Sequence, residues 1–302
     1  MSPRAARGAP DVGESAWARV GSAVGPVVVF VLTAAVLAVV FGFLLLPIVA
    51  LIVYQPVGQT LHEFGTQVST DAIKVSLKTN LIAMGLTLLL GTPFAYALGR
   101  SRFRGRNLVI TLVELPLVLP PAVAGIGLLA AYGRLGLLGG TLTSLGITLG
   151  FTQAAVVMAI VLVASPFYLR GAIAAFEAID PTLIDVAGTL GAGRVRRMLR
   201  VGLPLARAGL GASAALAFAR GIGEFGATIL FAGSFQGSTE TLSLAVYGQF
   251  DASLDQAVAI GVLLVIVSAA ILVTAKLLGS WTSSISTSLF RGGRSISAPR
   301  SA

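Results

Sequence analysis

The sequence has no cysteine, one histidine and few charged residues. Without cysteine the chain has no disulfide, no thiolate nucleophile and no cysteine-based metal site, and His62 alone cannot build a histidine cluster. Charged residues make up 11% of the chain, against about 25% in ordinary soluble domains, and 56% of the residues are hydrophobic. Too little polar sequence remains to coat a soluble globule, so most of the chain is expected to face lipid or other helices.

The hydrophobic residues gather in six runs of the length that a membrane-spanning helix needs, about 20 residues. We therefore expect an all-α membrane protein with six transmembrane helices, at residues 26–54, 81–98, 108–132, 149–169, 203–231 and 257–278. The third run contains Glu114 and the prolines Pro116, Pro120 and Pro121. Because proline interrupts helical hydrogen bonds, this run is expected to be bent or partly unwound.

Basic residues indicate the topology, because lysine and arginine accumulate in cytoplasmic loops. Seventeen of the 21 fall near the two ends of the chain and in or next to the loops after the second and fourth runs: Arg4, Arg7, Arg19, Arg100, Arg102, Arg104, Arg106, Arg170, Arg194, Arg196, Arg197, Arg200, Arg207, Lys276, Arg291, Arg294 and Arg300. Both termini are therefore expected in the cytoplasm, with tails at 1–25 and 280–302 around a membrane domain at 26–279. The net positive charge follows from this topology and does not indicate nucleic-acid binding.

The loop at about 177–204, after the fourth run, is amphipathic and interrupted by glycines. An Asp-Pro pair at Asp180 predicts a helix start, since aspartate caps free amide groups and proline fits the first helical position. Apolar residues recur at helical spacing as far as Leu190, and Gly191 can end that helix in a tight turn. A short basic helix is expected between this turn and Pro204, which opens the fifth run.

This loop resembles the EAA motif of ABC-importer permeases, which reads E-A-A, three residues, G, nine residues, I, one residue and L-P. The spacing matches at every position, with aspartate replacing the glutamate and valine replacing one alanine. In that family the motif sits in a groove of the ATPase subunit, so the resemblance implies an ATPase-coupling loop that contains Asp185, Val186, Ala187, Gly191, Val201, Leu203 and Pro204. A surface hairpin at the lipid headgroups would explain the arginines equally well, but it would not explain the spacing.

Further segments are similar to the molybdate subgroup of these permeases, with the sulfate permeases as close relatives. They are LPLVLPPAVAGIGLL at 115–129 and FARGIGEFGATILFAG at 218–233, followed by TETLSLAVY at 239–247. The resemblance implies the permease subunit of a molybdate importer, with tungstate also accepted, in a bacterial or archaeal inner membrane. PAVAGIGLLAAYG leans toward the sulfate group and keeps sulfate or thiosulfate as the alternative substrate.

The partners that the resemblance implies are a cytoplasmic ATPase dimer, an external oxyanion-binding protein and a second permease subunit, expected to be another copy of this chain. The chain has no GxxxxGK[ST] loop to hold nucleotide phosphates. It is therefore expected to be non-catalytic, without a cofactor or metal of its own, while the partner hydrolyses ATP. An ion-coupled secondary transporter is the alternative class, because broken helices and charges inside the membrane would suit it as well.

Arg220 and Glu224 lie four residues apart in the fifth run, so they share a helix face and can pair. Ionisable groups at membrane depth commonly face a bundle interior or a pathway. We expect this pair to line the translocation path or gate, where the arginine would bind an oxyanion and the glutamate would prevent tight binding; a purely structural pair is the alternative. Pro120, Pro121 and Gly125 are expected to form a bend that moves during gating or a static kink.

Overall fold

The computed structural model describes residues 14–291, with side chains for residues 28–274. It contains two compact units, Met1–Tyr54 and Gln55–Ala302. The first unit consists of helix α1, Glu14–Val53. Its segment Val28–Val53 is long and apolar enough to cross a membrane, and none of the side chains in this segment is buried. This segment corresponds to the first predicted span.

The second unit is built from helices, and no strand occurs among the described residues. Its elements are α2 (Val57–Phe64), α3 (Gln67–Arg100), α4 (Arg106–Val118), α5 (Pro121–Tyr132), α6 (Gly139–Ser144), α7 (Gln153–Glu177), α8 (Pro181–Thr189), α9 (Arg194–Arg197), the π-helical turn η1 (Met198–Gly202), α10 (Leu203–Ile222), α11 (Gly226–Ala232), α12 (Leu242–Phe250) and α13 (Leu254–Arg291).

Helix α7 forms the centre of this unit and packs against both α3 and α10. Its small and β-branched residues are buried along most of its length, and Tyr168 and Phe176 are the largest side chains that it buries. The hydroxyl groups of Tyr168 and Thr92 of α3 are 2.5 Å apart and share a hydrogen bond, which satisfies two polar groups in an apolar core. Close packing around α7 therefore fixes the positions of α3 and α10.

The expected number of spans is confirmed, but several boundaries differ. Five helices are long and apolar enough to cross a membrane, and α4 with α5 would make a sixth, although the two are bent by 110° at Leu119–Pro120. This bend confirms the prediction for the third run. The continuous fifth span at 203–231 was wrong, because α10 ends at Ile222 and α11 starts only at Gly226.

The prediction of a short basic helix that is separate from the fifth span was also wrong. Helices α9, η1 and α10 form one helix from Arg194 to Ile222. Pro204 has no N–H group and cannot donate to the carbonyl four residues earlier. The turn before it is π-helical, and the Leu203 amide donates to the carbonyl of Met198, five residues back. The wider turn lets the helix pass the proline without ending.

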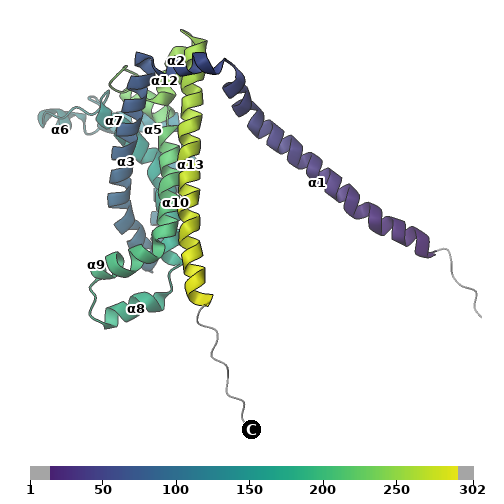
Figure 1. Cartoon of the computed structure of the whole chain (residues 1–302). Helices are drawn as coiled ribbons and strands as arrows, with labels where there is room; N and C mark the ends of the chain where they lie inside the picture. The colour runs from purple at the N-terminus through teal and green to yellow at the C-terminus, as the bar shows by residue number, and fades with distance from the viewer. Residues whose placement is uncertain (1–13, 292–302) are drawn as a thin grey trace, which may run out of the picture. The chain divides into compact units, whose positions relative to one another are not determined.

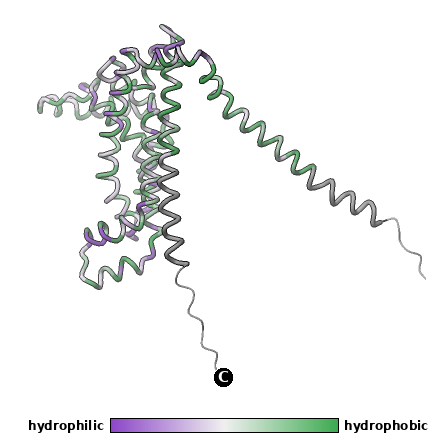
Figure 2. Tube along the Cα trace, viewed as in Figure 1, coloured by the Kyte–Doolittle hydropathy of each residue, from purple (hydrophilic) through white to green (hydrophobic). Residues whose placement is uncertain are grey.

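The two ends of the second unit differ in the elements that they carry (Figure 1). Helices α8 and α9 lie at one end, whereas α2 and α12 lie at the other. Polar residues gather at both ends, and apolar residues follow the long helices between them (Figure 2). The 177–204 loop therefore lies at the end of this unit that is opposite to α2 and α12.

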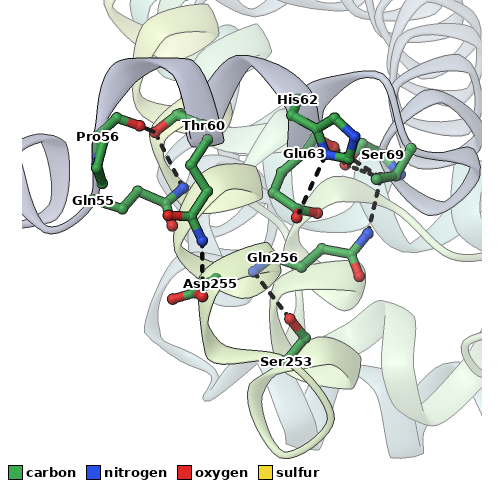
Figure 3. Close-up of polar contacts among 11 residues, drawn as sticks. Gln55, Pro56, Thr60, His62, Glu63, Ser69, Ser253, Asp255 and Gln256 are labelled. Carbon is green, nitrogen blue, oxygen red and sulfur yellow. Dashed lines mark hydrogen bonds and ion pairs between the residues drawn. The ribbon is translucent and has the colours of Figure 1, made fainter.

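At the end opposite α8, polar contacts join α2 and the N-cap of α3 to the start of α13 (Figure 3). The Gln59 Nε2 donates to Asp255 Oδ2 at 2.9 Å, and the Gln256 Nε2 donates to Thr66 Oγ1 at 2.8 Å. His62 is exposed on α2, as expected for a solvated surface.

The structure describes only part of the two segments that were predicted as tails. Residues 1–13 and 292–302 lie outside the described residues, while α1 begins at Glu14 and α13 continues to Arg291, inside the segments that were predicted as tails.

Candidate functional site

Helix α8 of the 177–204 loop begins as its sequence predicts. The Asp180 Oδ1 accepts a hydrogen bond from the Thr182 amide at 2.9 Å, and Pro181 occupies the first helical position. The hydrogen bonds from Thr182 hold the pKa of the Asp180 carboxyl below its ordinary value of 3.8, and the positive charge of Arg100 adds to this effect. The cap therefore stays ionised, which favours the helix start.

The end of α8 is a glycine turn, also as predicted. Gly191 has a φ of +81°, a conformation that side chains with a β-carbon rarely adopt. The Gly191 amide donates to the Gly188 carbonyl and the Ala192 amide donates to the Ala187 carbonyl, each at 3.0 Å. These two bonds form a Schellman motif, which closes the helix with its own main chain.

Between its two ends α8 presents one apolar face inward and another outward. Ile184 is buried and belongs to the core of the second unit. Leu183 and Val186 are about half exposed, and Leu190 is 82% exposed. These three residues are three and four positions apart, so they form one stripe on the outer face of the helix. An exposed apolar stripe of this kind marks a surface that a partner or lipid covers.

Asp185 of α8 lies near a group of arginines. It lines a cavity of about 500 Å³ together with Arg100, Arg194 and Arg197, and a second cavity of about 730 Å³ together with Arg102 and Arg106. No ion pair of Asp185 occurs among the described residues. Its carboxylate is exposed close to these positive charges and forms no ion pair with any of them.

Of the remaining positions of the motif, two are partly buried and two are exposed. Ala187 is partly buried, and Val201 packs against the core. Leu203 and Pro204 are exposed at the start of α10. The seven matched positions thus lie in one continuous element, from α8 through the glycine turn to the first turn of α10.

The second group of candidate residues surrounds the interruption at residues 223–225, here called the α10–α11 break. The Arg220 Nη1 lies 2.8 Å from Glu224 Oε2, which confirms the expected pair. Glu224 is 2% exposed, and its Oε1 accepts the Ala227 amide at 2.8 Å. In a continuous helix that amide would bond to the Gly223 carbonyl. The carboxylate therefore caps α11 and helps to end α10.

The bend between α4 and α5 packs directly on this break. A β-carbon at Gly125 would lie 2.7 Å from the Ala227 carbonyl oxygen, and one at Gly226 would lie 2.8 Å from Cβ of Pro121. Only glycine allows two main chains to approach so closely. Pro121 and Gly125 therefore lie against the turn that follows Glu224. Pro120, the N-cap of α5, and Pro121 are both exposed.

An apolar cavity of about 280 Å³ opens next to the break. It is lined by Phe225, Ser243, Val246, Tyr247 and Phe250, and the rings of Phe225 and Tyr247 have centroids 5.2 Å apart. The Ser243 Oγ donates to the Ile222 carbonyl at 3.3 Å, so α12 pairs one main-chain group at the end of α10.

Two polar residues of α3 that lie beside the break were not predicted from the sequence. Ser76 and Asn80 are buried, and they preceded the second predicted span at 81–98. Their spacing of four residues in an apolar segment was the available signal, because it puts both on one helix face. The lysines Lys74 and Lys78 interrupted the hydropathy of this segment and hid it.

Comparison with known proteins decides the family. The model described as "Binding-protein-dependent transport system inner membrane component" matches residues 91–280, which include the 177–204 loop and the α10–α11 break. The chain belongs to this family. It is accordingly a multi-pass inner-membrane permease, built from the five or six apolar helices described above.

Individual relatives agree with this assignment. The permease is 43% identical over 227 residues to the molybdenum transport system permease protein ModB of Mycobacterium bovis, a match that covers 75% of this chain and 86% of the relative. It is 37% identical over 225 residues to the ModB protein of Escherichia coli K12, covering 74% and 96%.

A solved structure supports the fold alone. The crystal structure of a bacterial ABC transporter involved in alginate import has a TM-score of 0.64 and 19% identity, and the match covers 87% of this chain and 98% of that chain.

Proposed function

We propose that this permease is the membrane-spanning subunit of an ATP-driven molybdate importer, which also accepts tungstate. Two relatives at 43% and 37% identity are named molybdenum transport permeases, and each match covers about three quarters of this chain. The segments 115–129, 218–233 and 239–247 carry the resemblance to the molybdate subgroup.

The observation that supports ATP coupling most directly is the outer stripe of α8. Leu183, Val186 and Leu190 are exposed on an element that is held firmly at both ends, by the Asp180 cap and by the Gly191 turn. A rigid helix with an apolar outer face fits a groove in another protein. We assign this groove to a cytoplasmic ATPase, and we assign ATPase coupling to Asp185, Val186, Ala187, Gly191, Val201, Leu203 and Pro204.

The ATPase works as a dimer in this proposal, and two copies of the permease face one another around the path. An external oxyanion-binding protein delivers the substrate. The permease holds no nucleotide and needs no cofactor, because its sequence has no phosphate-binding loop and hydrolysis occurs in the partner.

The translocation path runs past the α10–α11 break in this proposal. The Arg220 side chain is 28% exposed, whereas that of Glu224 is almost fully buried behind it. The guanidinium can therefore offer N–H groups to a passing tetrahedral dianion, and the carboxylate limits how tightly the anion is held. Pro120, Pro121 and Gly125 form the opposing bend of the gate, which packs on this break.

Transport in proteoliposomes tests the proposal. The permease is reconstituted with its ATPase and binding protein, and uptake of radiolabelled molybdate is measured with ATP, without ATP, and with an imposed ion gradient. We expect uptake that requires ATP and that tungstate inhibits more strongly than sulfate. Stronger inhibition by sulfate would assign the permease to sulfate, and uptake driven by the ion gradient alone would make it a secondary transporter.

The docking surface is tested separately with matched variants. Leu190→Glu places a charge on the outer stripe of α8, and Leu61→Glu places one at an exposed apolar residue of α2, at the other end of the unit. Copurification with the ATPase should fail for Leu190→Glu and persist for Leu61→Glu. Equal retention of the ATPase by both variants would contradict docking through α8.

A further inference from the structure

Helix α3 binds α10, which ends at the α10–α11 break, and α12, which itself bonds to the end of α10 through Ser243. The Asn80 Nδ2 donates to the Phe218 carbonyl in the last turn of α10, at 3.1 Å. One turn earlier, the Ser76 Oγ accepts the Leu242 amide at 2.7 Å, which is the first amide of α12. The first amides of a helix have no partner within it, and in apolar surroundings they need one. The two side chains therefore tie α10 and α12 to one face of α3.

Asn80 is set firmly into this position. It is 0% exposed, and a β-carbon at Gly221 would lie 2.4 Å from its Oδ1. That oxygen has no hydrogen-bond partner among the described residues. A buried unpaired acceptor is unfavourable, so an apolar residue would pack here at lower cost. The bond from the Asn80 side-chain amide to α10 explains why a polar residue is present here. Helix α10 ends at Ile222, one residue after Gly221.

The other end of α3 contacts the 177–204 loop. The Arg100 Nη1 donates to the Ile179 carbonyl at 3.0 Å, directly before the Asp180 cap of α8. The Tyr96 ring packs on the π-helical turn, where a β-carbon at Gly202 would lie 2.8 Å from it. Asn80 and Arg100 belong to the same continuous helix, which spans about 30 Å between them.

We propose that Ser76 and Asn80 are positioning residues through which α3 transmits displacement of the 177–204 loop to Arg220 and Glu224. The loop and the break are far apart, and α3 makes a hydrogen bond at each. A continuous helix that is bonded at both sites connects them physically, and coupling requires such a contiguous link. The inference rests on the proposed transport function.

The experiment compares three variants in the reconstituted complex. Asn80→Leu removes the bond to α10, and Ser76→Ala removes the bond to α12. Thr92→Val is the matched control, because it removes a partly buried hydrogen bond of the same helix, to Tyr168, away from the break. Molybdate uptake and ATP hydrolysis are both measured, so that their ratio reports coupling. A second readout uses Tyr247→Cys, an exposed position beside the break in a chain without native cysteine, whose labelling rate is compared with and without nucleotide.

We expect Asn80→Leu to hydrolyse ATP but to transport about tenfold less molybdate per ATP, with a smaller loss for Ser76→Ala. Nucleotide should change labelling of Tyr247→Cys in the parent and in Thr92→Val, and this response should be lost with Asn80→Leu. An unchanged transport ratio, or an equal fall in Thr92→Val, would overturn the proposal. If Asn80→Leu does not assemble, Ser76→Ala decides by the same criteria.

Failure of the proposed function is distinguishable from failure of this inference. A parent complex that takes up no molybdate contradicts the function. The nucleotide response of Tyr247→Cys still tests the link through α3, because it requires the ATPase but not the substrate.

Discussion

The permease interrupts its helices in two different ways, and the surroundings account for the difference. At Gly191 the chain ends α8 with two main-chain hydrogen bonds and a positive φ, all within the six residues Ala187 to Ala192. At the α10–α11 break, the bonds come from side chains of Glu224 and of residues in α3 and α12. Water can pair whatever an exposed turn leaves open, whereas an apolar interior requires every partner to be supplied.

The exposed turn should therefore be sensitive to local backbone changes, and the buried break to changes in distant helices. The same contrast applies to apolar residues. Those of α8 face outward at Leu190, while around the break the polar groups face inward at Asn80 and Glu224. The proposed docking surface on α8 thus exposes apolar side chains, whereas the α10–α11 break buries polar ones.

The largest effect is expected from removing the positive charge at the break. Arg220→Leu leaves the buried Glu224 carboxylate without its cation, which should destabilise the protein by about 3 kcal/mol. The double variant Arg220→Leu with Glu224→Gln keeps an oxygen that can cap α11 but removes the charge, so it should recover most of the loss. Thermal denaturation in detergent measures both. A double variant as unstable as the single one would show that the unpaired Glu224 carboxylate is not the cause of the loss.

Overpacking the bend should have the next largest effect. Gly125→Val directs side-chain atoms at the Ala227 main chain, which cannot give way as a flexible side chain would, and should cost about 1–3 kcal/mol. Gly127→Val in the same helix is the control, because nothing lies within 4 Å of a β-carbon there. The thermal midpoint should fall for Gly125→Val alone. Equal midpoints for the two variants would mean that α5 and α11 separate readily.

The contrast between the two interruptions also explains what the sequence could reveal. The Asp180 cap and the Gly191 turn were predicted correctly because their signals lie within a few neighbouring residues. Hydropathy predicted the spans, and the prolines predicted the bend between α4 and α5. The fifth span was drawn through residues 223–225 because apolar composition continues there to Phe231.

The residues that hold the break could not be found in this way. Asn80 bonds to Phe218, 138 positions away, and Ser76 bonds to Leu242, 166 positions away. No local pattern specifies such a pairing, because it depends on how α3, α10 and α12 pack in three dimensions. The π-helical turn before Pro204 was missed for a different reason, since proline there was interpreted as a helix start.

At the exposed turn, Gly191→Ala should cost about 1 kcal/mol, because alanine is strained at positive φ. Gly193→Ala is the control, since Gly193 has an ordinary φ of −64°. The loss should be confined to α8, so hydrogen exchange of the α8 amides should accelerate while the thermal midpoint stays nearly constant. A drop of the midpoint as large as that of Gly125→Val would show that the turn is not independent of the core.

The smallest effect concerns a second buried carboxylate, which sharpens the contrast with Glu224. Glu240 has no cationic partner among the described residues; it is 8% exposed and accepts only a 3.3 Å hydrogen bond from Ser234 Oγ. Burial raises the pKa of Glu240 above its ordinary value of 4.5, the bond from Ser234 opposes this, and the negative charge of Asp71 adds to it. The folded state therefore holds this proton more tightly than the unfolded state does.

The stability that protonated Glu240 contributes is present below its unfolded pKa and is lost as the pH rises through its raised folded pKa. Glu240→Gln is neutral at every pH, so its thermal midpoint should fall less than that of the parent between mildly acidic and neutral buffers. Ser234→Ala removes the group that lowers the pKa, so its midpoint should fall more steeply with pH, because the proton is then held to a higher pH and its loss costs more. The same pH slope in the parent and in Glu240→Gln would mean that this carboxylate ionises in the folded protein as freely as in the unfolded chain.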